Sequence, residues 1–172
     1  MKGTIINCLE ELVSKRFGTE PWRLSLEIAG LPTSRIYGTF EDIPDTEVHS
    51  LFKAVSAALD LPLEGVMEAF GDHWSTVYAP RVYEAYYVGA KNSRDFLLHL
   101  DNIHTVMTKS LKSARPPRFR YEWRGEKHLI MHYESHRGLV ALMAGLVRGV
   151  GKHYGEYLNV SIVGNAVHIQ FP

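Results

Sequence analysis

The chain has 172 residues, of which 45% are hydrophobic and 22% charged, which is enough for one globular domain with a substantial core. Its 19 basic and 19 acidic residues cancel, and this balance argues against broad electrostatic binding to nucleic acid or to an anionic membrane. The single cysteine, Cys8, excludes an internal disulfide and a zinc site built from several cysteines. No apolar run approaches about 18 residues and the first residues do not resemble a signal peptide, so we expect a cytoplasmic protein without a membrane segment.

Helical patterns dominate the chain up to residue 113. Apolar residues recur at helical spacing in five segments, over about 9–17, 24–30, 45–58, 62–70 and 93–113, whereas the aromatic stretch 78–88 is either helical or irregular. Gly18 and Gly71 are expected to end the first and the fourth helix. Asp45 and Ser93 are expected to cap the third and the fifth at their N-termini.

Strand patterns follow the pair Pro116-Pro117. Alternating residues predict strands at 119–123 and 129–135, then a helix over about 138–150, then a hairpin of 157–163 with 166–171 around Gly164-Asn165. Helices followed by this order indicate an α+β fold, with helices beside a four-stranded antiparallel sheet. We expect one domain, 1–172, with a helical part at 1–65 and a second part at 66–172 that contains the sheet.

One histidine falls on the apolar face of the predicted helix 93–113. On a helical wheel His104 lies within the arc formed by Phe96, Leu100 and Met107, so a neutral imidazole is expected to face the core. Two interpretations explain this position: His104 is a core residue that donates a hydrogen bond to a backbone carbonyl, or it is a metal ligand. Because no second His or Cys stands at a useful helical spacing, a metal role favours haem, which needs one protein histidine for its iron.

Three hydrogen-bond donors stand at every second position in the segment YESHR. If the strand continues through it, Tyr133, Ser135 and Arg137 share one face. They are suited to an acceptor-rich partner, such as the two propionates of a haem. Two other hypotheses remain open at this point. The protein is a non-haem binding module for an apolar ligand with a carboxylate head, or it is an enzyme that uses His104 or His136 with Glu134, although no GxSxG motif is present.

Several motifs together resemble a known family. The opening MKGTIIN, the pair Phe70-Gly71, the segment LDNIHTVM, the pair Pro116-Pro117, the signature Tyr-x-Ser-x-Arg in YESHR and the run GLVRGVG occur at matching spacings over essentially the whole chain. On these residues the sequence resembles the heme nitric oxide/oxygen binding (H-NOX) domains, a family shared by bacterial gas sensors and the haem region of soluble guanylate cyclase.

The resemblance implies the cofactor and its protein contacts. The cofactor would be haem b (iron protoporphyrin IX), held between the helical part and the part with the sheet. His104 would be the only protein ligand of the iron, and Tyr133, Ser135 and Arg137 would bind the propionates. Pro117 would press on the porphyrin.

Two further positions match family residues that pack on the haem. These are Ile5 and Leu146, for which ordinary core packing is the alternative. Some members also hold a zinc ion through several cysteines, which this chain lacks.

The same resemblance indicates which gas is bound. Oxygen-binding members place a tyrosine donor where this chain has Leu142, so a pocket without that donor favours nitric oxide and carbon monoxide over oxygen. A tryptophan near the position of Trp74 lines the pocket in some relatives, and Trp74 would serve either as a donor or as a hydrophobic filler. We expect a non-enzymatic nitric oxide sensor in which the iron–His104 bond loosens. It would signal to a separate protein such as a histidine kinase or a cyclic-di-GMP enzyme, and would bind neither nucleic acid nor membrane.

Overall fold

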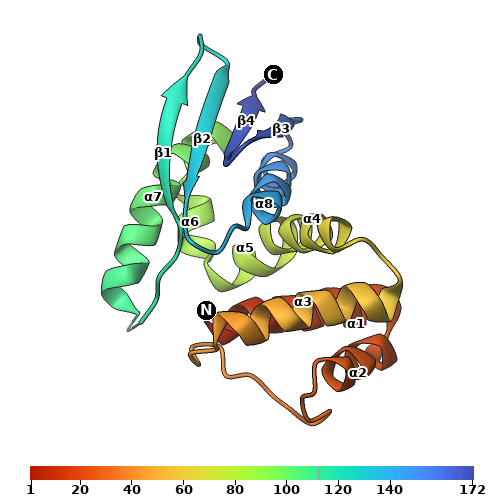
Figure 1. Cartoon of the computed structure of the whole chain (residues 1–172). Helices are drawn as coiled ribbons and strands as arrows, with labels where there is room; N and C mark the ends of the chain where they lie inside the picture. The colour runs from red at the N-terminus through yellow and green to blue at the C-terminus, as the bar shows by residue number, and fades with distance from the viewer. Residues whose placement is uncertain (112) are drawn as a thin grey trace. The chain divides into compact units, whose positions relative to one another are not determined.

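The computed structural model describes residues 1–111 and 113–172. The chain forms two compact units, Met1–Phe70 and Gly71–Pro172. The first is helical, and the second combines helices with a four-stranded antiparallel sheet, as Figure 1 shows. The predicted α+β class is therefore confirmed.

Three helices form most of the first unit: α1 (Gly3–Phe17), α2 (Thr19–Ile28) and α3 (Asp45–Leu59). Both α1 and α2 begin earlier than their apolar patterns indicate. The predicted end of α1 at Gly18 is confirmed, and this glycine has a φ of +92°. The core of the unit contains aliphatic residues that repeat at helical spacing and are fully or almost fully buried, among them Ile6, Leu9, Val13, Leu51 and Val55.

The predicted N-terminal cap of α3 is wrong. Asp45 is the first residue of the helix and Pro44 occupies the cap position. The carboxylate of Asp45 instead accepts a hydrogen bond from the amino group of Met1, with 2.8 Å between nitrogen and oxygen. It still lies in the first turn, where a negative charge interacts favourably with the helix dipole.

Helix α4 (Leu63–His73) runs through Gly71, so the prediction that this glycine ends the helix is wrong. A Cβ at Gly71 would lie 2.4 Å from the backbone nitrogen of Leu146, so the glycine is required by close packing rather than by a helix end. The chain continues as a π-helix, η1 (Trp74–Tyr78), and two short helices, α5 (Ala79–Val82) and α6 (Glu84–Val88). The stretch 78–88 is thus largely helical.

The second unit continues with a helix and a β-β-α-β-β segment, whose last two strands form the predicted hairpin. Its elements are α7 (Ser93–Ser110), β1 (Arg118–Trp123), β2 (His128–Glu134), α8 (Val140–His153), β3 (Asn159–Val163) and β4 (Ala166–Gln170). The strands lie in the order β1-β2-β4-β3, and every neighbouring pair is antiparallel. Gly164, with a φ of +59°, forms the β3–β4 turn with Asn165, as predicted.

Two details of α7 differ from the prediction. Asn92, not Ser93, is the N-cap, and its side chain accepts a hydrogen bond from the backbone N–H of Asp95. The helix also ends at Ser110 rather than near Ser113, because the backbone of Leu111 is already extended. Lys112 lies outside the described residues.

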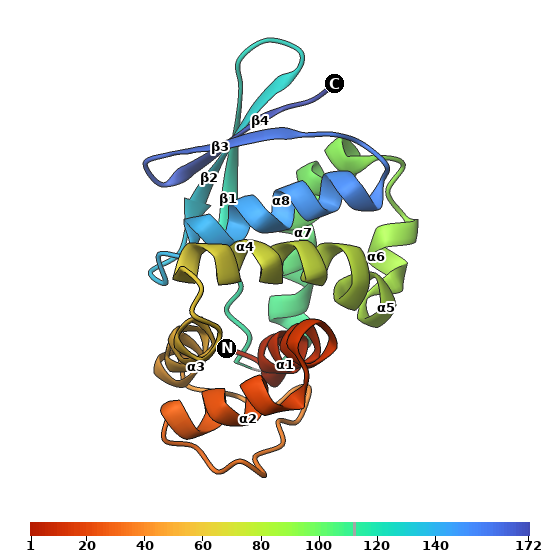
Figure 2. The ribbon, with the colours of Figure 1, turned by 90° about the vertical axis from the view of Figure 1, so that its right-hand side faces the viewer.

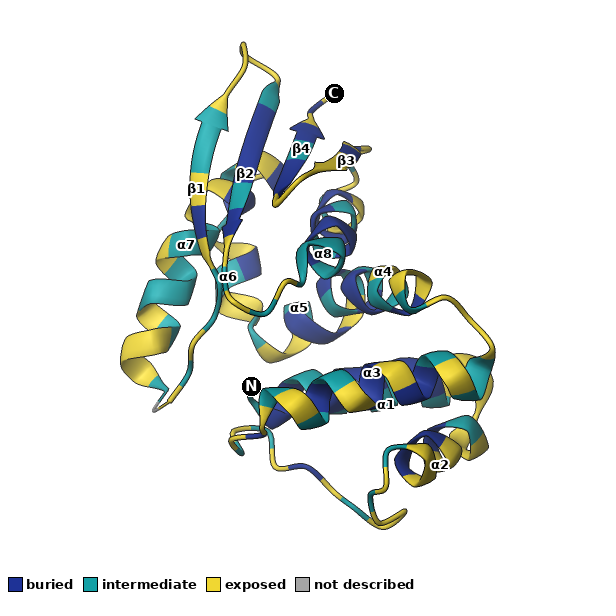
Figure 3. Ribbon diagram, viewed as in Figure 1, coloured by how far each residue is buried: buried dark blue, intermediate teal, exposed yellow. Residues whose placement is uncertain are grey.

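Helices α7 and α8 pack against one face of the sheet. The shared core contains residues from both helices and from all four strands, including Phe96, Leu97, Phe119, Met131, Met143, Val147, Val160 and Ile169. Figure 2 shows α8 running beside the end of α4, and Figure 3 shows the buried residues of β2 and β4. Among the described residues, no helix is long and apolar enough to cross a membrane.

Candidate functional site

His104 lies on α7, partly buried, with its ring directed toward the start of β1. Its Nδ1 is 2.8 Å from the backbone oxygen of Pro117. A carbonyl oxygen can only accept, so Nδ1 carries the proton and donates it to this bond. The tautomer is thereby fixed, and the lone pair of the imidazole is on Nε2.

The imidazole of His104 is held in its neutral form. Burial lowers its pKa, and the hydrogen bond to Pro117 opposes this shift only in part. Among the described residues the ring has no second hydrogen bond, so Nε2 keeps an unused lone pair. A neutral imidazole whose other nitrogen donates to a backbone carbonyl is the usual arrangement of a metal-binding histidine.

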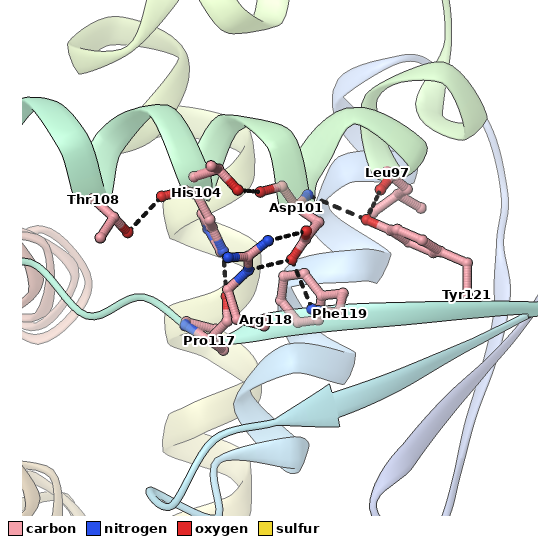
Figure 4. Close-up of polar contacts among 9 residues, drawn as sticks. Leu97, Asp101, His104, Thr108, Pro117, Arg118, Phe119 and Tyr121 are labelled. Atoms are coloured by element: carbon pink, nitrogen blue, oxygen red, sulfur yellow. Dashed lines mark hydrogen bonds and ion pairs between the residues drawn. The ribbon is translucent and has the colours of Figure 1, made fainter.

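Asp101, one turn before His104, fastens α7 to the first residues of β1 (Figure 4). Its Oδ1 accepts from Nε of Arg118 at 2.8 Å and from the backbone N–H of Phe119 at 2.9 Å, and its Oδ2 accepts from Nη2 of Arg118 at 2.5 Å. The guanidinium of Arg118 lowers the pKa of Asp101. Because residues 118 and 119 directly follow Pro117, this contact also fixes the carbonyl that orients His104.

Asp101 and Arg118 were not predicted as site residues. The available signal for Asp101 is its position three residues before His104 on the predicted helix, a spacing that puts both side chains near one face. Arg118 carried no signal of its own, since only the fold brings it beside the helix.

A row of aromatic rings connects His104 to the signature motif. The His104 and Phe119 ring centroids are 5.4 Å apart, and those of Phe119 and Tyr133 are 6.4 Å apart. Both Phe119 and Tyr133 are buried. The fold thus brings the histidine, Pro117 and Tyr133 into one neighbourhood across α7, β1 and β2.

The prediction that Tyr133, Ser135 and Arg137 share one strand face is wrong for the last two. Strand β2 ends at Glu134, which pairs with Arg118, the first residue of β1, so the ladder has no partner beyond it. Ser135 and Arg137 lie in the following turn, where the hydroxyl of Ser135 accepts from the backbone N–H of Arg137 at 3.3 Å.

The side chain of Arg137 reaches back toward the segment that precedes β1. Its Nη1 donates to the backbone oxygen of Arg115 at 2.5 Å. The guanidinium therefore lies beside the residue that precedes the Pro116-Pro117 pair. The motif is a turn at a strand end, not a row of side chains along a strand.

The other predicted residues lie on α8, on η1 and in the first unit. Leu142 and Leu146 are partly buried on α8, and the backbone oxygen of Leu146 accepts from the hydroxyl of Ser75 at 3.0 Å. The Trp74 ring stacks on that of Tyr78, with 5.5 Å between centroids. Ile5 belongs to α1 of the first unit, whereas all the other predicted site residues belong to the second.

The exposed face of the sheet carries an open groove. Charged and imidazole side chains line it, including Arg120, Glu122, Arg124, His132 and His168. Tyr133 is also among its lining residues, whereas His104 and Arg137 are not. In the part of the chain that the structure describes, no group of three or more His, Cys, Asp or Glu side chains could hold a metal ion.

A family model described as haem-NO-binding matches residues 2–162. This chain belongs to that family, the H-NOX domains. They are haem-based gas sensors that bind diatomic gases and signal to partner proteins, and the domain is not catalytic by itself.

Solved H-NOX structures share the fold. A Cs H-NOX mutant with 4-cyano-L-phenylalanine at site 5 superposes with a TM-score of 0.89 at 26% identity, covering 99% of this chain and 96% of that one. An oxygen-binding H-NOX domain related to soluble guanylate cyclases, in its oxygen complex, superposes with a TM-score of 0.85 at 26% identity, covering 99% of this chain and 95% of that one. The S. oneidensis H-NOX protein in its Fe(II)NO ligation state superposes with a TM-score of 0.89 at 22% identity, covering 100% of this chain and 99% of that one. At this identity the likeness supports the fold and nothing more specific.

Curated relatives are much longer proteins. Soluble guanylate cyclase gcy-32 of Caenorhabditis elegans is 27% identical over 168 residues, which are 95% of this chain and 24% of that protein. Soluble guanylate cyclase gcy-34 of the same organism is 27% identical over 157 residues, 88% of this chain and 23% of that protein. The chain therefore spans about a quarter of the length of these relatives.

The side chains of the second unit fit the haem that the family binds. His104 offers one neutral nitrogen with an unused lone pair, and an iron in haem needs only one such protein ligand. Aromatic rings lie beside it, and the guanidinium of Arg137 supplies a positive charge suited to a carboxylate.

Proposed function

We propose that this protein is a nitric oxide sensor in which His104 is the single protein ligand of a haem b iron. The observation that carries the proposal is the hydrogen bond from Nδ1 of His104 to Pro117, which leaves Nε2 as a neutral donor toward a metal. When bound, a ferrous haem would supply an iron that takes up a diatomic gas. The chain's own residues hold that iron, orient its ligand and choose the gas.

The propionates would be bound by Tyr133, Ser135 and Arg137. Arg137 supplies the charge-assisted hydrogen bonds, which are about twice as strong as bonds between neutral groups. Its present contact with a backbone carbonyl keeps the guanidinium beside the Pro116-Pro117 pair. We further propose that Pro117, Ile5 and Leu146 pack on the porphyrin.

Selectivity for nitric oxide over oxygen would come from an apolar gas pocket. Bound oxygen carries partial negative charge and is stabilised by a hydrogen-bond donor, which matters less for nitric oxide or carbon monoxide. The side chain of Leu142 offers no donor at the position where oxygen-binding members carry a tyrosine. The ring of Trp74 is packed on Tyr78, which supports its role as a hydrophobic filler.

Signalling would begin at His104. If bound nitric oxide weakened the hold of His104 on the iron, His104 and the helix that bears it would gain freedom to move. A ligand shifts a conformational equilibrium only if it interacts differently with the two states, and here the bond to His104 is the interaction that differs. The output would pass to a partner protein such as a histidine kinase or a cyclic-di-GMP enzyme.

Absorption spectra of the ferrous protein test this function. They are recorded without ligand, in air, with carbon monoxide and with nitric oxide. We expect spectral changes with nitric oxide and carbon monoxide and none from stable oxygen binding in air. A stable oxygen complex, or an unchanged spectrum with nitric oxide, would refute the selectivity. A colourless protein that takes up no offered haem would instead favour a non-haem module for an apolar carboxylate ligand.

Haem retention tests the proposed propionate contacts. Substitution Arg137→Ala, alone and with Tyr133→Phe, is expected to speed haem transfer to apomyoglobin several-fold. The controls are Glu134→Gln and His136→Gln, which alter exposed residues of the same segment. Equal transfer rates in all four variants would contradict the assignment.

A further inference from the structure

Helix α7 is fastened to β1 at successive turns. His104 bonds to Pro117, Asp101 bonds to Arg118 and Phe119, and the next contact toward the helix N-terminus involves Tyr121 (Figure 4). The helix and the strand run antiparallel, so each turn of α7 meets residues further along β1. The contact at Tyr121 differs from the others, because it involves the hydrogen bonds of the helix backbone itself.

The hydroxyl of Tyr121 lies between two backbone groups of α7. It donates to the backbone oxygen of Leu97 at 2.8 Å and accepts from the backbone N–H of Asp101 at 3.2 Å. Leu97 and Asp101 are four residues apart, so these two groups are the acceptor and the donor of one ordinary helical hydrogen bond. Burial raises the pKa of Tyr121 to about 12, so the hydroxyl keeps the proton that it donates.

A side chain that inserts into the helical hydrogen-bond ladder is a recognised cause of helix bending. At this turn the hydroxyl competes with the direct bond between Leu97 and Asp101, and the backbone there has an alternative partner on each side. The turn is therefore easier to open than its neighbours, because at those turns the described residues of β1 place no hydroxyl between two backbone groups of α7.

The insertion divides α7 into two halves with different surroundings. On its N-terminal side, Phe96 and Leu97 are 5% and 0% exposed in the core. On its C-terminal side, Val106 is 41% exposed and residues 108–110 are exposed. His104 stands on this outer half, one turn beyond the insertion.

We propose that Tyr121 is a positioning residue whose hydroxyl makes the Leu97–Asp101 turn the bending point of α7. The inner half stays in the core, and the outer half, with His104, swings about this turn. The inference rests on the proposed role of His104 as the iron ligand. It adds that the freedom of His104 to leave the iron is set by a hydroxyl on a neighbouring strand.

Tyr121→Phe tests this, because it removes the hydroxyl and leaves the ring in place. The matched control is Tyr154→Phe, which removes another partly buried hydroxyl of the same unit. This hydroxyl donates to the backbone oxygen of Tyr87 at 2.7 Å, on α6 rather than on α7. Two quantities are compared in the haem-loaded protein. The first is the hydrogen-exchange rate of the Asp101 amide, and the second is the fraction of the nitric oxide complex in which His104 stays bound, read from absorption and electron paramagnetic resonance spectra.

In Tyr121→Phe the Asp101 amide should bond directly to Leu97, so its exchange should slow several-fold and the His104-bound fraction should rise. Tyr154→Phe should change neither. Unchanged or faster exchange at Asp101 in Tyr121→Phe would overturn the bending point, whatever the haem does. Slower exchange with an unchanged His104-bound fraction would overturn its influence on His104. A wild-type protein that binds no nitric oxide contradicts the proposed function, and the exchange comparison then still decides the bending point.

Discussion

Asp101 holds α7 on β1 through two interactions that substitutions can separate. One is the ion pair with Arg118, whose side chain is 51% exposed. The other is the hydrogen bond from the backbone N–H of Phe119, a residue whose side chain is buried. A half-exposed ion pair contributes about 0.2–1 kcal/mol to the free energy of unfolding. Leaving a buried amide without an acceptor costs about 1–3 kcal/mol.

Three variants should therefore differ in their free energy of unfolding in a defined order. Asp101→Ala loses both interactions and should be destabilised by about 1–4 kcal/mol. Asp101→Asn keeps an acceptor for the Phe119 amide, and Arg118→Ala keeps the whole carboxylate, so each should lose no more than about 1 kcal/mol.

The order of the three stabilities is measured as Tm in thermal unfolding, with all variants at the same haem occupancy. For a chain of this length about 1 kcal/mol corresponds to about 2–4 °C in Tm, so Asp101→Ala should lie several degrees below the other two. Arg120→Ala is the control, because that arginine is on the same strand and its closest carboxylate, Glu134, is 3.8 Å away. Equal losses in Asp101→Ala and Arg118→Ala would show that the ion pair, not the amide, is the larger contribution.

Three further outcomes follow from the packing, the charges and the gas pocket. Gly71→Ala would place a Cβ 2.4 Å from the backbone of Leu146 and should destabilise by about 1–3 kcal/mol in urea unfolding, whereas Gly65→Ala, with open space around it, should be neutral or stabilising by up to about 1 kcal/mol. Burial and the nearby His128 and Arg124 lower the pKa of His168, so the folded state binds its proton less well than the unfolded state. The neutral His168 therefore contributes fully to the free energy of unfolding above its ordinary pKa of about 6.5, and this contribution is lost as the pH falls through the lowered pKa of the folded state. His168→Gln should flatten the dependence of Tm on pH in that range. Leu142→Tyr adds a donor to the proposed gas pocket and should stabilise bound oxygen, so that the ferrous variant shows an oxygen complex in its absorption spectrum in air. A spectrum in air identical to that of the wild type would count against the position of that pocket.

Much of the second unit could be predicted from sequence because its patterns are local. The hairpin around Gly164-Asn165 depends on a turn that needs a positive φ, and the strand periodicity before it depends on alternate burial. His104 was predicted to be a neutral residue facing the core, and its lowered pKa and its bond to Pro117 agree with this.

The errors came from features that depend on residues distant in sequence. Gly71 was expected to end a helix, but the glycine serves a close approach to α8, which only the fold creates. Ser135 and Arg137 were placed on a strand because their spacing is regular, but a strand ends where its partner ends, and β1 begins at Arg118. Tyr121 fitted the strand alternation and gave no sign that its hydroxyl contacts a helix.

The central claim is that Nε2 of His104 holds the haem iron, and replacement of this side chain tests it most directly. His104→Gly removes the imidazole and leaves space for a free imidazole molecule. The absorption spectrum of the ferrous variant is recorded with and without added imidazole, beside His99→Gly, whose exposed histidine lies on the same helix. We predict that His104→Gly loses the wild-type Soret band and regains it with imidazole, and that His99→Gly keeps it throughout. A wild-type spectrum in His104→Gly without imidazole would contradict the account.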